Sequence, residues 1–172
     1  MFLNYIKNYF LIKLLKNNFR NAKSISSEAP IQTIGLLIDD SYFSEKEALL
    51  KEVIANGILE RNIKIVVYRD KIKKNEVHPY TTFGAKHINW NLKINNVEVN
   101  DFINQKFNLL ISYYDVEKAI LLKVTNDSKA QFKVGFSSID KKLNQLIINT
   151  NAENHTVFVH ELFRYLKILN KI

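Results

Sequence analysis

Residues 108–115 read Asn-Leu-Leu-Ile-Ser-Tyr-Tyr-Asp, and this stretch decides the fold. Its middle, from Leu109 to Tyr114, is a short apolar and aromatic run between polar residues, which is typical of a strand buried on both faces. Residues 116–126 then continue with helical character. Asp115 stands at the junction, where a carboxylate can accept the unpaired N–H groups of a first helical turn, so we predict that it is the N-cap. The stretch therefore predicts one strand-to-helix step of an open α/β sheet.

Similar runs on either side extend the predicted sheet. The apolar run 33–38, a helix that ends at Asn56-Gly57 and a strand over 63–68 form a βαβ unit, which should be parallel and right-handed. Two more strands are predicted at 131–136 and 146–148, followed by a final helix that ends near residue 170. Capping boxes are predicted where the first and last of these helices begin, at Ser44 with Glu47 and at Thr150 with Glu153.

The segment between residues 70 and 106 has a different pattern. Apolar residues alternate with polar ones from Ile88 to Ile94, which is typical of a half-exposed strand. Asn95-Asn96 is a plausible turn, so we predict an edge hairpin with residues 97–99 and then a short helix over 100–105.

These patterns predict a three-layer α/β sandwich of flavodoxin-like or Rossmann-like form, with four or five largely parallel strands and an edge hairpin. We expect a basic N-terminal helix over residues 1–24, a linker over 25–31 and a single α/β domain over 32–172. With 172 residues, 47% of them apolar, the chain can bury one ordinary core. It contains no cysteine, which excludes disulfides and thiol chemistry.

Positive charge is concentrated at the beginning of the chain. The net charge is +8, and residues 1–30 hold five basic groups against the single acid Glu28, so half of the excess lies there. In the predicted first helix, one face carries Phe2, Tyr5, Ile6, Tyr9 and Ile12 and then continues with lysines and arginine. Lysines interrupt its apolar stretches, so the segment fits neither a signal peptide nor a membrane span. A half-apolar, half-basic face indicates docking on a polyanion or at a lipid interface.

A second basic cluster follows the strand over 63–68. Neutralising several phosphates gives affinity without any reading of bases, so both clusters are candidate nucleic-acid contacts. The candidate residues are Lys13, Lys16, Arg20, Lys23, Arg69, Lys71, Lys73 and Lys74.

Acidic residues follow two of the predicted strands. In open α/β sheets, ligands bind beyond the carboxyl ends of the strands, and this rule brings Asp39, Asp40 and Asp115 toward one crevice. Such carboxylates are weak candidates for catalysis, and two or three of them are ligands suited to Mg²⁺. Residues 39–44 lack the glycines of a dinucleotide-binding loop, and no Walker motif is present, which argues against NTP or NAD chemistry. We therefore expect no cofactor and favour a protein that is not an enzyme.

A resemblance to a known family rests on four segments of the chain, residues 108–115, 128–137, 139–144 and 150–153. The chain resembles an uncharacterised bacterial family of small basic α/β proteins, a domain of unknown function. The resemblance implies a bacterial, cytoplasmic protein. More loosely, residues 108–137 are similar to the acceptor-side Rossmann-like domain of heptosyltransferase-like glycosyltransferases, in which an apolar strand, a helix and a strand like Lys129–Phe136 recur.

Three functional hypotheses follow from the sequence. The first is a non-catalytic binding protein that docks on a polyanion, RNA or a ribonucleoprotein, through the basic clusters. The second is a small-ligand binder or Mg²⁺-dependent enzyme that uses the acidic crevice. The third is a peripheral membrane protein held on an acidic membrane surface by the first helix.

Overall fold

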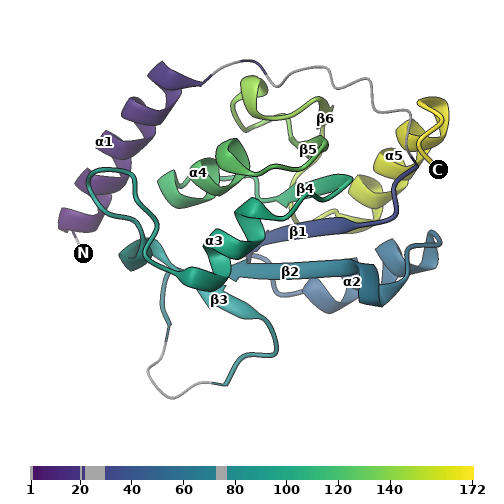
Figure 1. The fold of residues 1–172 in the computed structure, drawn as a ribbon, viewed down its shortest axis with the longest axis horizontal. Helices are drawn as coiled ribbons and strands as arrows, with labels where there is room; N and C mark the ends of the chain where they lie inside the picture. Colours follow the sequence, from purple (N-terminus) through teal and green to yellow (C-terminus); the bar gives the residue numbers. More distant parts are fainter. Residues whose placement is uncertain (1, 20, 22–29, 73–76) are drawn as a thin grey trace.

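The computed structural model describes residues 2–19, 21, 30–72 and 77–172, and the side chains from Tyr5 onward. Within these residues six strands form one sheet, with the order β3-β2-β1-β4-β5-β6 and every neighbouring pair parallel (Figure 1). The strands are β1 (Ile34–Asp39), β2 (Ile63–Tyr68), β3 (Thr81–Phe83), β4 (Leu109–Tyr113), β5 (Phe132–Phe136) and β6 (Leu146–Ile148). The order reverses between β1 and β4, which is the switch point of a doubly wound sheet.

Helices cover both faces of this sheet. The described helices are α1 (Phe2–Asn18), α2 (Lys46–Ala55), α3 (Val97–Asn104), α4 (Ala119–Asp127) and α5 (His155–Ile168). Helix α2 contacts α5, α3 contacts α4, and α1 contacts α4 from the outside (Figure 1). Every residue of β1 and β4 is buried, as expected for central strands covered on both sides. The predicted α/β class and the mostly parallel sheet are confirmed, but the predicted number of four or five strands is too low, since β3 is not among the predicted strands and the described sheet has six strands.

The predicted edge hairpin is wrong. Ile88 and Ile94 form only an isolated antiparallel bridge, and the residues expected to be its second strand form helix α3. Asn96 is the N-cap of that helix, because its side chain accepts a hydrogen bond from the N–H of Val99 at 3.0 Å. The short strand β3 takes the edge position instead and pairs with β2.

The predicted helix caps are also wrong. Helix α4 begins at Ala119, so Asp115 lies four residues before it and is not its cap. Helices α2 and α5 begin after Glu45 and Asn154, and neither start has a side-chain cap hydrogen bond. The C-terminal signal at Asn56-Gly57 is confirmed, since α2 ends at Ala55 and Gly57 has a φ of 95°.

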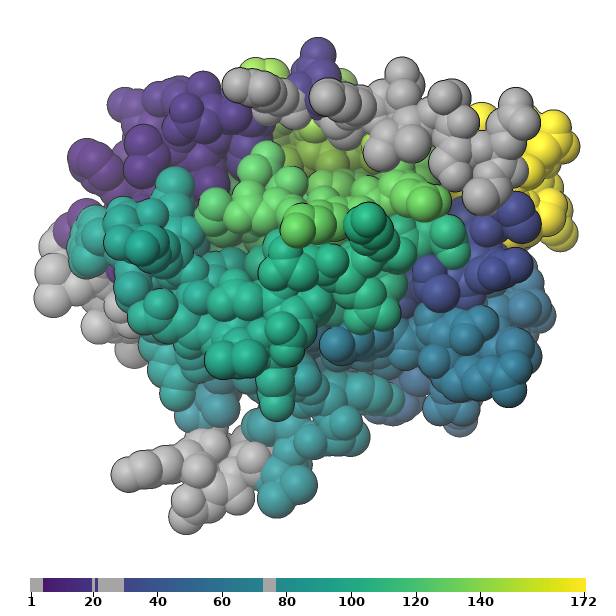
Figure 2. Space-filling view, viewed as in Figure 1, coloured from purple at the N-terminus to yellow at the C-terminus, as the bar shows by residue number. Residues whose placement is uncertain are grey.

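Helix α1 lies within the predicted N-terminal helix. Residues 20 and 22–29, which include most of the predicted linker, lie outside the described residues. Figure 2 shows the purple atoms of α1 at one corner of the molecule, beside teal and green segments of the domain. None of the described helices is long and apolar enough to cross a membrane.

Gly35 is required by the packing of the sheet face. A Cβ atom at this position would lie 2.7 Å from Cδ2 of Phe107, and Phe107 is itself fixed against Phe102 with ring centroids 5.0 Å apart. We therefore expect Gly35→Ala to lower the free energy of unfolding by about 1–3 kcal/mol through overpacking, measured by urea denaturation. Lys64, the exposed partner of Gly35 in β2, gives the control, since Lys64→Ala should cost less than about 0.5 kcal/mol. Equal midpoints for the two variants would contradict this account.

Candidate functional site

Lys118 occupies the switch point at the carboxyl ends of the strands. Lys118 is only 8% exposed. Its Nζ lies 2.7 Å from Oδ2 of Asp39 and 3.1 Å from Oδ1 of Asp70. The same Nζ donates to Oγ of Ser41 at 3.1 Å and lies 4.4 Å from the centroid of the Tyr68 ring. Three partners match the three hydrogens of the ammonium group. Lys118 thus joins the end of β1, the end of β2 and the start of α4.

Asp40 forms a second ion-pair group beside the first. Its Oδ2 lies 2.6 Å from Nη2 of Arg69 and accepts from Nε at 2.7 Å, while its Oδ1 lies 3.1 Å from Nζ of Lys46. The Asp40 side chain is nearly buried, so these partners compensate its charge where water does not.

Asp115 has a different role from these two carboxylates. Its Oδ2 accepts a hydrogen bond from the N–H of Ala152 at 2.8 Å, and the hydroxyl of Tyr113 donates to the carbonyl of Ala152 at 2.7 Å. These bonds hold the connection between β6 and α5 against the end of β4. The structure therefore places Asp39 and Asp40 in two adjacent ion-pair groups and leaves Asp115 outside both. No group of three or more histidines and carboxylates in the described part of the chain is placed to hold a metal ion.

The network alters the protonation of its members. Burial raises the pKa of Tyr68, and the hydrogen bond that its hydroxyl donates to Asp70 raises it further. For Asp70, burial raises the pKa, but the hydrogen bonds from Tyr68 and Lys118 outweigh this and hold the pKa below its usual value. Asp70 is therefore firmly ionised at neutral pH.

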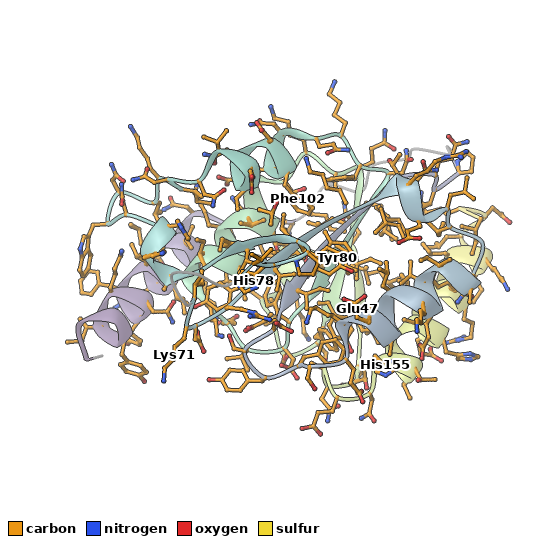
Figure 3. The ribbon with its side chains drawn as sticks, turned by 90° about the horizontal axis from the view of Figure 1, so that it is seen from below. Glu47, Lys71, His78, Tyr80, Phe102 and His155 are labelled. Carbon is orange, nitrogen blue, oxygen red and sulfur yellow. The ribbon has the colours of Figure 1, made fainter. Side chains whose placement is uncertain are left out.

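An open crevice of about 390 Å³ lies over this network. The described residues that line it are Asp40, Ser41, Arg69, Asp70 and Lys71. Lys71 is exposed, and it makes no ion pair with any described residue. Figure 3 places Lys71 on the same side of the molecule as α1.

The predicted nucleic-acid contacts are only partly described. Lys13 is exposed on α1, whereas Lys16 pairs with Glu117 at 2.6 Å and Arg69 pairs with Asp40. Lys7 and Leu11 of α1 line one small cavity together with Tyr68, the residue before Arg69, so the helix adjoins the beginning of the segment after β2. Four of the predicted contacts lie outside the described residues, namely Arg20, Lys23, Lys73 and Lys74.

Exposed aromatic side chains are concentrated on and around α1 and at the carboxyl end of β1. They are Tyr5, Tyr9, Phe10, Tyr42 and Trp90, and they include every exposed aromatic among the side chains that the structure describes. Three belong to α1, Tyr42 follows β1, and the Trp90 ring lies 5.9 Å from Nζ of Lys7 on α1.

Sequence reasoning missed both Lys118 and this aromatic group. Lys118 is one lysine among many, and no spacing distinguishes it; only the register of β1, β2 and β4 brings its partners together. The predicted apolar face of the first helix contains Tyr5 and Tyr9, whereas α1 buries Leu11 and Leu15 instead.

Comparison with known proteins gives a family and no activity. A family model described as "Family of unknown function (DUF6913)" matches residues 7–169. No curated protein and no solved structure matches the chain. The looser similarity to heptosyltransferase-like enzymes therefore stays a prediction.

Removing the positive charge at the switch point should destabilise the fold. We expect Lys118→Met to lower the free energy of unfolding by about 3–5 kcal/mol, because Asp39 is then left buried without its partner. Lys123 provides a matched control in the same helix, since it forms a more exposed i,i+4 pair with Asp127, and Lys123→Met should cost about 0.5 kcal/mol. Urea unfolding of both variants measures the difference, and similar losses would show that the network at Lys118 has no special weight.

Three buried tyrosines should resist ionisation in the folded protein. Burial raises the pKa of Tyr68, Tyr113 and Tyr114, so each stabilises the fold fully below the unfolded value of about 10 and loses this contribution as the pH rises through the folded value. At about pH 11, absorbance at 295 nm should report at least three fewer tyrosinates among the eight tyrosines than in denaturant. Tyr68→Phe should reduce the difference by one tyrosinate. Equal absorbance in the folded and unfolded protein would disprove the shifts.

Proposed function

We propose that this chain, which belongs to DUF6913, a family of unknown function, is a non-catalytic binding protein that docks with α1 on an anionic membrane surface. One observation carries the proposal: α1 packs on its own domain through one apolar face and presents a second apolar face to solvent.

The inner face of α1 is fixed to the domain. Leu11 and Leu15 are four residues apart and are buried in the common core, as is Phe19, which follows the helix directly. The side-chain oxygen of Asn8 accepts the first N–H of α4, from Ala119, at 2.8 Å. Lys16 pairs with Glu117, and Lys7 donates to the carbonyl of Ile88. These contacts set which side of the helix is turned outward.

The outer face of α1 is apolar and aromatic. Tyr5, Ile6, Tyr9, Phe10 and Leu14 are all exposed, with Tyr5 at 73% and Phe10 at 63%. A helix that is apolar on two sides needs a second apolar environment, because a surface helix of a globular protein normally turns polar residues to water.

The charge of α1 favours a lipid interface as that environment. The helix contains three lysines and no acidic residue. Lysines beside tyrosine, phenylalanine and leucine are the composition of helices that lie in the plane of an anionic bilayer, with aromatic rings at the level of the headgroups. Lysine stems can cover apolar surface while their ammonium groups reach the phosphates.

RNA is the alternative partner, because cations and aromatic rings also bind single strands. Ile6 and Leu14, however, offer nothing to phosphates or bases, and Lys16 and Arg69 already have carboxylate partners. We therefore favour the membrane, and the RNA hypothesis becomes an outcome of the experiment.

Vesicle flotation of the full chain tests the proposal. We expect the protein to float with vesicles of phosphatidylcholine and phosphatidylglycerol and not with phosphatidylcholine alone. The double variant Tyr9→Ser, Phe10→Ser should bind at least about tenfold more weakly, since it removes two apolar side chains from the interface. Lys13→Gln should weaken binding about fivefold, the value of one lysine near an anionic surface.

The matched control is Ile168→Ser, which removes an exposed apolar residue from α5, and it should bind as the natural sequence does. Filter binding of single-stranded RNA over a salt series forms the second arm. Steeply salt-dependent RNA binding without flotation would replace the membrane by RNA. No binding in either arm would reject docking by α1 on any polyanion.

A further inference from the structure

We infer that the crevice at the carboxyl ends of β1 and β2 binds a phosphodiester headgroup that ends in an ammonium group. The inference rests on the proposed membrane docking and adds to it the lipid chemistry that the protein would select.

The crevice lies next to the proposed docking helix. Lys7 and Leu11 of α1 line one small cavity together with Tyr68, the last residue of β2. Arg69, Asp70 and Lys71 follow Tyr68 directly and line the crevice. Figure 3 shows Lys71 and α1 at the same side of the molecule. A bilayer that contacts α1 would therefore lie on the side of the molecule where Lys71 is exposed.

Among the residues that the structure describes, the charges of the crevice leave one cation for an anionic ligand. The carboxylates of Asp39, Asp40 and Asp70 are matched by the cations Lys46, Arg69 and Lys118, in the ion pairs already described. Lys71 adds a positive charge without a described acidic partner. A phosphodiester carries one negative charge and hydrogen-bond acceptor oxygens, which suit an exposed ammonium group.

Ser41 fixes the wall of the crevice. Its Oγ accepts from the N–H of Asp70 at 3.1 Å and from Nζ of Lys118 at 3.1 Å. Its hydroxyl hydrogen serves the Asp70 carboxylate, and this hydrogen bond helps to lower the pKa of Asp70. Ser41 therefore holds Asp70 in place at the crevice wall, and Lys71 is the donor to the phosphate.

The Asp70 carboxylate is the proposed binding partner of the ligand's ammonium group. Its Oδ1 accepts a hydrogen bond from the Tyr68 hydroxyl and pairs with Nζ of Lys118. Its side chain nevertheless remains 44% exposed and lines the crevice. The lowered pKa of Asp70 keeps it ionised at neutral pH. An exposed carboxylate close to Lys71 therefore matches a ligand with separated negative and positive ends.

Calorimetric titration with soluble headgroup esters tests this inference on the full chain. We expect glycerophosphoethanolamine to bind with a millimolar dissociation constant and glycerophosphocholine to bind at least tenfold more weakly, because its quaternary ammonium has no N–H to donate to Asp70. Lys71→Gln should weaken ethanolamine-ester binding about tenfold, and Lys64→Gln, on an exposed part of β2 away from the crevice, should change nothing.

Asp70→Asn should remove the preference for ethanolamine over choline. If loss of the Lys118 contact prevents this variant from folding, Lys71→Gln and the two esters still decide the question. Equal affinities for the two esters, or competition by inorganic phosphate at the same strength, would overturn the inference in favour of a simple anion site. No titration signal at about 50 mM ester would overturn it altogether, that concentration being far above a millimolar constant.

The flotation experiment separates this inference from the proposed function. Vesicle binding without ester binding would leave docking by α1 in place and remove headgroup recognition. Ester binding without flotation would remove membrane docking and leave a site for a free phosphodiester, which would contradict the lipid assignment.

Discussion

Lys118 brings a positive charge into the carboxyl edge of the sheet, where carboxylates from two different strands meet it. The ammonium group is almost fully enclosed, so its desolvation is offset only because Asp39, Asp70 and Ser41 all lie within 3.1 Å. The ends of β1 and β2 and the start of α4 are thereby held in one arrangement. The shape of the crevice and the surface on which α1 packs both depend on this arrangement.

The same network explains why acidic residues at a switch point need not form a metal site. Each carboxylate that the sequence places there has its own cationic or backbone partner. Asp39 and Asp40 are consecutive, yet they turn to different cations, and Asp115 turns to the backbone of residue 152. What is left for a ligand is the rim of the network, where Asp70 and Lys71 are exposed at the crevice.

The sequence predicted the sheet much better than its edges. β1 and β4 are apolar runs buried on both faces, and such runs identify central parallel strands with little help from tertiary contacts. β2 is fully buried only over its second half, from Val66 to Tyr68. β3 contains only three residues, too few for a period, and Asn96 suits a turn and a helix cap equally well. The local pattern predicts Asp115 as the cap of α4, but the first N–H of this helix donates to Asn8, more than a hundred residues earlier in the chain. Hydrogen-bond partners this far apart in the sequence cannot be predicted from a local pattern. The same holds for the partners of Lys118, which come from the ends of two other strands.

The bond from Asn8 to Ala119 also makes α1 a structural part of the domain. A chain cut before residue 24 would lose the acceptor for the first N–H of α4, the partner of Glu117 and three core side chains at once. Its behaviour would then report a damaged core as much as a missing surface. Substitutions confined to the solvent side of the helix keep those inner contacts, and they are the changes that can separate recognition from architecture in this protein.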